Sequence, residues 1–192
     1  KNNTHWLRRL PGQLMHNIIS HGIAKIAEYL PGEDAEVTAV GFASGFVREL
    51  SEQSLIDELR LIIRGQNGVT AYFTFSTQMR PLLREFRIYG PRNGLALNQE
   101  NHSLVRLPGA SPKSYLAKFL PLNDLARQYR RNMFANLKWF LKNDFHMKEG
   151  MHRLLRSFYD SIEANGPPPI PYREILLTSR IMDAAFKQAC PI

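Results

Sequence analysis

The chain has 192 residues, 44% of them hydrophobic, and a formal net charge of +8. This apolar content is enough for a core and excludes a disordered chain. The length fits one large domain, and no run of about 18 apolar residues that could span a membrane is present. The single cysteine, Cys190, excludes an internal disulfide and favours a reducing compartment, so we expect a cytoplasmic protein.

The positive charge favours anionic partners in general, but the lysines and arginines are spread along the chain. The densest groups are Arg127 with Arg130 and Arg131, and Arg153 with Arg156. No zinc-finger spacing and no aromatic RNA-binding strand accompanies them. We therefore favour a solvated basic surface over a nucleic-acid site. The alternative predicts an affinity for DNA or RNA that falls steeply with salt.

The first predicted element is a helix between two turn signals, Pro11-Gly12 and Pro31-Gly32. Its first half carries four polar residues: His16, Asn17, Ser20 and His21. Asn17 and His21 are four residues apart, so they share one face of the helix. A histidine held by a neighbouring asparagine could act as a general acid or base toward a hydroxyl or carbonyl. A surface or partly buried histidine is the alternative.

Alternation of apolar and polar residues predicts strands after this helix. Residues 36–44 alternate, and so do residues 57–65 and 69–77, which the turn sequence GQNG joins. Two such runs joined by a short turn predict an antiparallel hairpin. Residues 85–90 and 95–99 repeat this pattern around PRNG, and residues 102–107 add one more possible strand.

After a connection over residues 108–121 the period becomes helical, with helices predicted over residues 125–143, 148–165 and 172–189. Gly166 is expected to end the second of these, before the stiff linker PPPIP. Strands followed by helices favour an α+β fold: an open, mostly antiparallel sheet of about six strands with helices packed on one face. The other face carries aromatic residues and would form a dimer or interdomain contact.

Several kinds of site are not favoured by the sequence. His16 and His21 are five residues apart, which does not direct both rings at one ion, so no metal site is expected. Cys190 has no activating neighbour except Lys187 and is expected to be inert. No nucleophile elbow, Walker A loop or Gly-x-Gly-x-x-Gly motif is present. The stretch GPRNG could hold an anion, but a turn between two strands is the favoured interpretation.

Three stretches together resemble one family. LPGQLMHNIISH resembles the start of the second domain of the Gfo/Idh/MocA oxidoreductases, the glucose–fructose oxidoreductase and inositol dehydrogenase group, where the pattern is Gly-Gly-x-x-x-Asp-x-x-x-His. FRIYGPRNGLAL resembles a sheet segment of that family, and FYDSIEANGPPPIPYREILLTSRIMDAAF resembles its closing helix, linker and helix. The resemblance covers nearly the whole chain, in the family's order.

The resemblance implies that residues 1–192 form a single α+β domain for substrate binding and oligomerisation, like the C-terminal domain of glyceraldehyde-3-phosphate dehydrogenase. A Rossmann domain that binds NAD or NADP would precede it and is absent from this chain. The same resemblance puts a catalytic lysine of a Glu-Lys-Pro motif in that absent domain. The isolated chain is therefore expected to be inactive, and a chain that opens without methionine suits a fragment or a processed protein.

Residue by residue, His21 matches the family's catalytic histidine and Asn17 its usual aspartate. Gly12 and Gln13 match the glycine pair near the cofactor edge, with glutamine in place of the second glycine. Asparagine cannot accept a proton as a carboxylate does, which weakens a proton relay through position 17. Asn17 could still orient His21 or hydrogen-bond a substrate hydroxyl.

The resemblance therefore implies an NAD(P)-dependent oxidoreductase acting on a sugar, a polyol or a related hydroxyl or carbonyl group. The alternative is a non-catalytic ligand-binding and dimerisation module derived from that family. The expected partners are a sugar-like small molecule and a second copy of the chain, bound through the open sheet face. Neither nucleic acid nor a membrane is expected as a partner.

Overall fold

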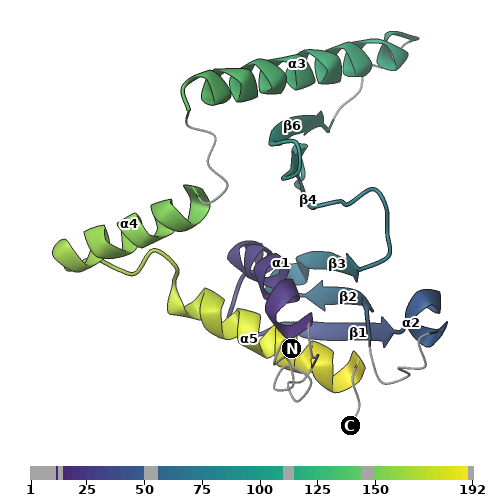
Figure 1. Ribbon diagram of the computed structural model, residues 1–192, viewed down its shortest axis with the longest axis vertical. Coiled ribbons are helices and arrows are strands. Elements are labelled where there is room, and N and C mark those ends of the chain that lie inside the picture. Colours follow the sequence, from purple (N-terminus) through teal and green to yellow (C-terminus); the bar gives the residue numbers. More distant parts are fainter. Residues whose placement is uncertain (1–11, 13–14, 50–55, 110–114, 144–148, 190–192) are drawn as a thin grey trace. The chain divides into compact units, whose positions relative to one another are not determined.

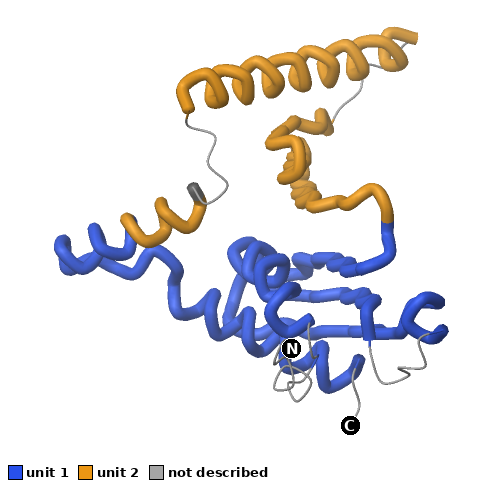
Figure 2. Tube along the Cα trace, in the orientation of Figure 1, with its two compact units in different colours: residues 1–79, 157–192 blue, residues 80–156 orange. Residues whose placement is uncertain are grey.

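The computed structural model describes residues 12, 15–49, 56–109, 115–143 and 149–189. They form an α+β protein with six antiparallel strands in two sheets (Figure 1). Contacts divide the chain into two compact units, residues 1–79 with 157–192 and residues 80–156 (Figure 2). Two contact units can belong to one domain, so the single domain expected from the sequence stays a prediction.

The first unit contains a three-stranded sheet in the order β1-β2-β3, with β1 at Glu36–Phe42, β2 at Glu58–Arg64 and β3 at Thr70–Ser76. The predicted hairpin is confirmed, since β2 and β3 pair antiparallel in the register Leu61↔Phe73. A short 3₁₀ turn at Gln66–Gly68 connects them, and Asn67 has a positive φ of 60°. Asparagine tolerates this left-handed conformation better than most residues, which suits it to a tight turn.

Two helices cover one face of this sheet: α1, Met15–Tyr29, and α5, Tyr172–Ala189 (Figure 1). The periodicity of the strands explains which face is covered, because alternate residues of β2 are buried while Ile62 between them is exposed. Helix α1 approaches the sheet closely, since a Cβ on Gly22 would overlap the ring of Phe73 in β3. The fully buried side chains of this core are Ile19, Ile23, Leu59, Ile63, Leu177, Ile181 and Phe186.

An arginine ties the two helices together at the end of α1. The Arg173 guanidinium donates to the carbonyl oxygens of Leu30 and Gly32, both at 2.9 Å, and to that of Ala27 at 3.4 Å. The last carbonyls of a helix lack partners within the helix, and a cation there also suits the helix dipole. Arg173 therefore fixes where α1 ends relative to the start of α5.

The second unit contains the other sheet, in the order β4-β5-β6, with β4 at Glu85–Tyr89, β5 at Asn93–Asn98 and β6 at Ser103–Pro108. A 3₁₀ turn, Tyr115–Lys118, leads into the long helix α3, Leu120–Leu141, which packs along the edge strand β6. The predicted pairing of the strands around PRNG is confirmed, with Tyr89 opposite Gly94.

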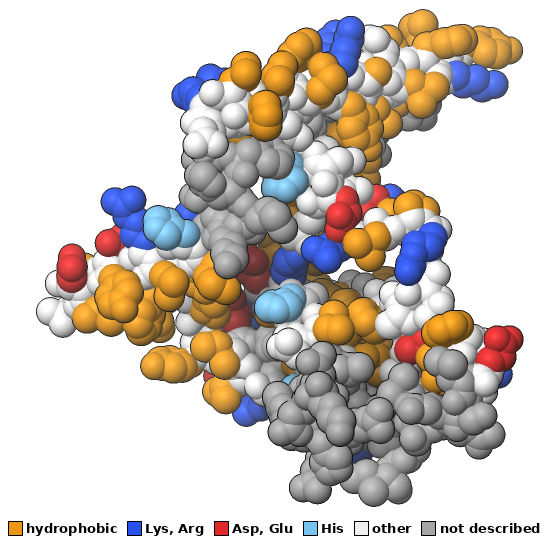
Figure 3. Space-filling view, viewed as in Figure 1, with side chains coloured by type: hydrophobic (Ala, Val, Ile, Leu, Met, Phe, Trp, Pro, Cys, Tyr) orange, Lys and Arg blue, Asp and Glu red, His pale blue; other side chains and the backbone are white. Residues whose placement is uncertain are grey.

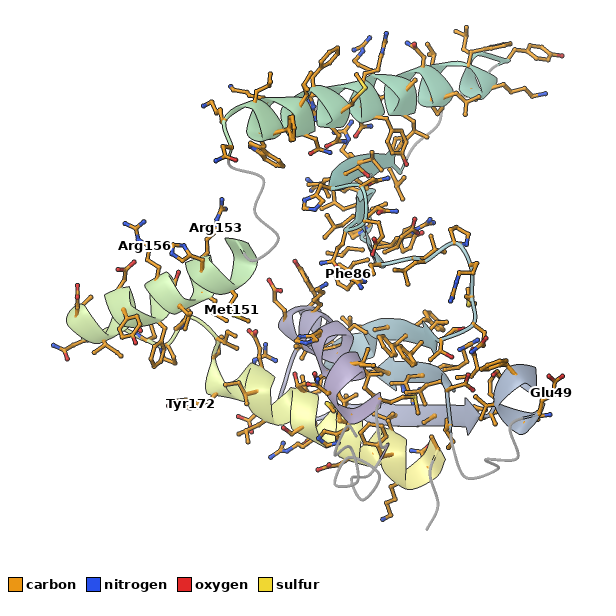
Figure 4. All side chains as sticks on the ribbon, viewed as in Figure 1. Glu49, Phe86, Met151, Arg153, Arg156 and Tyr172 are labelled. Atoms are coloured by element: carbon orange, nitrogen blue, oxygen red, sulfur yellow. The ribbon has the colours of Figure 1, made fainter. Side chains whose placement is uncertain are left out.

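Helix α4, Glu149–Glu163, crosses the boundary between the two units. It is amphipathic, and Figure 4 shows Arg153 and Arg156 on one side with Met151 on the other. Its end is built differently from the prediction: Asn165 takes the left-handed conformation with φ of 47°, and the Gly166 N–H donates to the Ser161 carbonyl at 2.8 Å. Asparagine thus performs the terminating role expected of Gly166.

The expectation of one open sheet is wrong in this structure, because the described strands pair as two three-stranded sheets. Alternation in the sequence marks each strand but does not decide which strands pair. The start of α3 also differs, since it lies five residues before the predicted 125. A short helix α2, Gly45–Glu49, was not predicted. Within the described residues, none of the helices combines the length and the apolar character needed to cross a membrane.

Candidate functional site

The predicted helix of the site residues is confirmed, and its two faces have opposite character. Met15, Ile19 and Ile23 are buried against the core, each at most 3% exposed. Asn17 and His21 lie on the opposite, exposed face of α1, one turn apart. Burial of the apolar stripe therefore holds these two polar side chains at the surface, where a ligand could reach them.

The other two polar residues singled out on α1, Ser20 and His16, are engaged within the protein. The Ser20 hydroxyl donates to the backbone carbonyl of Asn17 at 2.7 Å, as serine often does within helices. The His16 ring stacks on the ring of Phe186 in α5, with centroids 5.5 Å apart and an interplanar angle of 19°. His16 is thus part of the packing between α1 and α5, and only His21 presents an exposed imidazole on this helix.

The glycine predicted near the cofactor lies before α1. Gly12 is buried, has a positive φ of 74°, and a Cβ in its place would overlap the ring of Phe186. Glycine is therefore required there both by the backbone conformation and by the packing. Gln13, the second predicted cofactor residue, lies outside the described residues.

A polar cluster that the sequence did not predict surrounds Asp57, just before β2. Asp57 is 4% exposed. Its Oδ1 accepts from the Ser44 N–H at 2.6 Å, and its Oδ2 accepts from the Ser44 hydroxyl at 2.8 Å and the Thr77 hydroxyl at 2.7 Å. Gln78 adds a longer bond of 3.3 Å from its Nε2. The carboxylate thus joins the end of β1 to the end of β3.

These hydrogen bonds lower the pKa of Asp57. Burial by itself raises the pKa of this carboxyl, but the bonds from the Ser44 backbone, Thr77, the Ser44 hydroxyl and Gln78 outweigh it, so the pKa lies below its usual 3.8. The carboxylate is ionised at neutral pH, and its oxygens are already occupied. It therefore acts as a structural tie rather than as an acid or base toward a ligand.

Glu58 extends the cluster on the other face of β2. It is 5% exposed and pairs with the Arg60 guanidinium at 2.7 Å, and the Ser76 hydroxyl also donates to it. Arg60 donates to the Phe75 carbonyl at 2.7 Å and lies over the Phe42 ring, 5.5 Å from its centroid. The only sequence signal for this cluster is two acidic residues at the start of an apolar strand, and their burial is a tertiary property.

One open depression of 390 Å³ lies where α4 leads into α5, lined by Phe158, Ser161, Ile162, Asn165, Gly166, Pro168 and Tyr172. Neither His21 nor Asn17 lines it, so the structure does not bring this depression together with the predicted site. In the described part of the chain, no three His, Cys, Asp or Glu side chains lie close enough to hold a metal ion.

No family model matches the chain, and a search of curated proteins finds no significant match.

Proposed function

We propose that the chain is the substrate-binding and dimerisation domain of an NAD(P)-dependent oxidoreductase acting on a sugar, a polyol or a related hydroxyl or carbonyl group. The observation that carries the proposal is the exposed pair Asn17 and His21 on α1, a helix that is otherwise anchored by a buried apolar stripe. The three stretches that resemble the Gfo/Idh/MocA oxidoreductases supply the reaction class.

In the proposed reaction, His21 takes the proton of the substrate hydroxyl during oxidation and returns it during reduction. Asn17 lies one turn before it and would hold the ring or a second substrate hydroxyl by a hydrogen bond. The nicotinamide supplies the hydride chemistry when it is bound. A lysine of a preceding domain would polarise the same substrate oxygen.

In this proposal the residues of this chain support cofactor binding, and a preceding domain holds most of the cofactor. Gly12 is buried against Phe186, so its contribution would be to hold the turn before α1 in place. His21 is exposed and therefore free to face a nicotinamide held by a preceding Rossmann domain. We also propose that the α+β fold is of the glyceraldehyde-3-phosphate dehydrogenase C-terminal type, which the antiparallel strands and the helices on one face of a sheet support.

The proposed homo-oligomer would form through the uncovered face of the β1-β2-β3 sheet. Val40, Phe42, Ile62 and Tyr72 are on that face, and each is at least 38% exposed. Apolar side chains clustered on a sheet face are typical of an interface between subunits. A cytoplasmic location suits this proposal, since the only cysteine of the chain is Cys190.

A non-catalytic ligand-binding and dimerisation module is the second candidate. The asparagine at position 17 favours it, because an amide cannot replace a carboxylate in a proton relay. The two candidates share the interface and the exposed helix face. They differ in whether a bound nicotinamide changes its oxidation state.

The test uses the whole natural protein that contains this chain. Binding of NADH or NADPH is measured by fluorescence titration, and turnover is followed at the nicotinamide absorbance with a panel of sugars and polyols. Binding with turnover supports the oxidoreductase, whereas binding without turnover of any compound supports the non-catalytic module. A protein that binds neither nucleotide would exclude the oxidoreductase. It would also exclude a non-catalytic module that has kept the cofactor.

The sharper prediction concerns the imidazole. Replacing His21 by alanine should lower kcat by at least about 100-fold while nicotinamide binding persists, since a positioned acid or base typically contributes that much. The matched control is His152→Ala, the same change at an exposed histidine of α4. A His21→Ala enzyme with the kcat of the natural protein would remove this residue from the chemistry.

A further inference from the structure

Helix α3 is held in a defined orientation by amide side chains. The Gln128 side chain accepts from the Arg106 N–H at 2.7 Å and donates to the Arg106 carbonyl at 3.1 Å. One turn later, the Asn132 side chain accepts from the Leu104 N–H at 3.4 Å and donates to the Leu104 carbonyl at 3.0 Å. These bonds to the edge strand β6 decide which face of α3 points toward the sheet and which points away from it.

The face that points away from β6 is apolar. Each residue of a helix is rotated by about 100° from the one before, so Leu122, Tyr129, Met133, Leu137 and Phe140 lie about 100–180° from Gln128. Their exposed fractions range from 49% for Leu137 to 69% for Phe140. Phe134 and Leu141 widen this arc and are 61% and 74% exposed. Figure 3 shows hydrophobic and basic side chains together along this helix.

The charged residues of α3 are also distributed unevenly around the helix. The helix contains four basic residues, Arg127, Arg130, Arg131 and Lys138, and one acidic residue. That acid, Asp124, accepts from Gln128 at 2.9 Å on the side of β6. Arg130 is exposed and lies within the apolar arc. Arg127 and Lys138 are also exposed and border the arc on one side. The outward surface therefore combines apolar and aromatic side chains with positive charge and contains no described acidic residue of α3.

A partner helix fits this surface poorly. A coiled-coil seam needs apolar residues at alternating steps of four and three, and from Leu122 that series reaches position 136. Position 136 is Asn136; a single asparagine can occur in such a seam, but this one turns toward β6, since its Nδ2 donates to the Asn101 carbonyl at 2.9 Å. The apolar arc is also wider than a coiled-coil seam, which uses only two apolar residues in each heptad. Wide apolar arcs bordered by lysine and arginine are typical of helices that lie in a membrane surface.

We propose that α3 docks the protein on an anionic membrane surface, with its axis in the plane of the membrane and the β4-β5-β6 sheet away from it. The apolar arc would enter the boundary between headgroups and acyl chains, and the cations would pair with anionic headgroups. Arg130, within the arc, can extend its charged end to the headgroups while its stem stays among apolar groups. The sequence-based expectation of no membrane partner rested on the lack of a spanning segment, and a surface helix needs no such segment.

The test is cosedimentation of the full chain with vesicles of phosphatidylcholine containing phosphatidylglycerol, at low salt, with pure phosphatidylcholine vesicles alongside. We expect binding to the anionic vesicles that weakens as salt is raised. The triple variant Arg127→Gln/Arg130→Gln/Lys138→Gln should bind about 100-fold more weakly, because each cation near an anionic surface contributes about a factor of five. The double variant Met133→Ser/Phe140→Ser should lose binding as well.

The matched control for charge is Arg48→Gln/Arg153→Gln/Arg156→Gln, which removes the same charge from exposed positions on α2 and α4 and should bind as the natural chain does. Circular dichroism verifies that every variant is folded. Three results would overturn the proposal: no binding to anionic vesicles, binding that the α3 variants leave unchanged, and α3 variants that alter the molar mass of the protein while no vesicle is bound. The last result would show that protein covers this surface.

Discussion

At the scale of single residues, Asp57 and His21 are titratable groups in two opposite surroundings. Asp57 is buried, ionised and surrounded by donors from Ser44, Thr77 and Gln78. His21 lies exposed on a helix whose other face is core. The first ties the ends of two strands together, and the second is placed where it can meet a ligand. Partners and exposure, rather than residue type, separate the structural role of Asp57 from the chemical role proposed for His21.

The pKa of Asp57 predicts how stability depends on pH. Because the folded state holds this pKa below the usual 3.8, the charged form stabilises the fold at neutral pH, and that stabilisation is lost as pH falls from about 3.8 through the folded pKa. Asp57→Asn should lower the free energy of unfolding by about 1–3 kcal/mol at pH 7. Urea unfolding at pH 7 and pH 3 measures this, and the difference between the two proteins should shrink at pH 3.

The control is Asp183→Asn, the same change at an exposed aspartate of α5. It should leave the free energy of unfolding at pH 7 within the error of the measurement, since substitutions of this kind at the surface are usually near neutral. An Asp57→Asn protein that is as stable as the natural chain at pH 7 would contradict the structural role of the carboxylate.

At the scale of elements, both sheets use helix amides to cover the edge strand beside a helix. In one sheet Gln128 and Asn132 of α3 bind the backbone of β6. In the other, the Gln188 side chain of α5 accepts from the Ala39 N–H at 3.0 Å and donates to the Val37 carbonyl at 2.8 Å on β1. A primary amide offers one acceptor and two donors, so it can replace the neighbouring strand that an edge lacks.

Replacing Gln128 by methionine should therefore destabilise the edge of β6. The change keeps the length of the side chain but leaves the Arg106 N–H and carbonyl without their partner, which should cost about 1–3 kcal/mol of unfolding free energy. Amide hydrogen exchange at Arg106 should become faster than in the natural chain. Gln99→Met, at an exposed glutamine, is the control. Unchanged exchange at Arg106 would show that α3 does not protect this edge.

At the scale of the whole molecule, each unit has a helix-covered side and an exposed apolar surface. In the first unit that surface is the outer face of the β1-β2-β3 sheet, where Ile62 and Tyr72 lie opposite each other on neighbouring strands. In the second unit it is the outward face of α3. Single exposed apolar residues are normal, but clusters of this kind indicate surfaces that another molecule covers.

The sheet face is the one proposed to join two copies of the chain. Tyr72→Lys places a charge on that face beside Ile62, and burying an unpaired charge in an interface is costly. We expect the proposed dimer to dissociate to monomers, measured by light scattering coupled to size exclusion. Tyr89→Lys, at an equally accessible tyrosine of β4, should leave the molar mass unchanged. A dimer that tolerates Tyr72→Lys would move the interface elsewhere.

Much of the local structure could be predicted because its signals are local. The turn signals around α1, the alternation of β1, β2 and β3, and the bounds of α5 all follow from neighbouring residues. The same is true of the placement of Asn17 and His21 on one helix face. Where the prediction of a boundary or a terminus was wrong, as at the start of α3 and at Asn165, a proline-containing segment or an asparagine in a glycine's role hid the signal.

By itself, the sequence determined the α+β class, the six strands and the helix that carries His21, because period and punctuation are properties of adjacent residues. Only the tertiary structure decided that the strands divide into two sheets, that Asp57 is buried, and that α3 turns its amides to β6 and its apolar arc outward. Pairing, burial and helix orientation depend on residues far apart in the chain, and no local pattern encodes which of them meet.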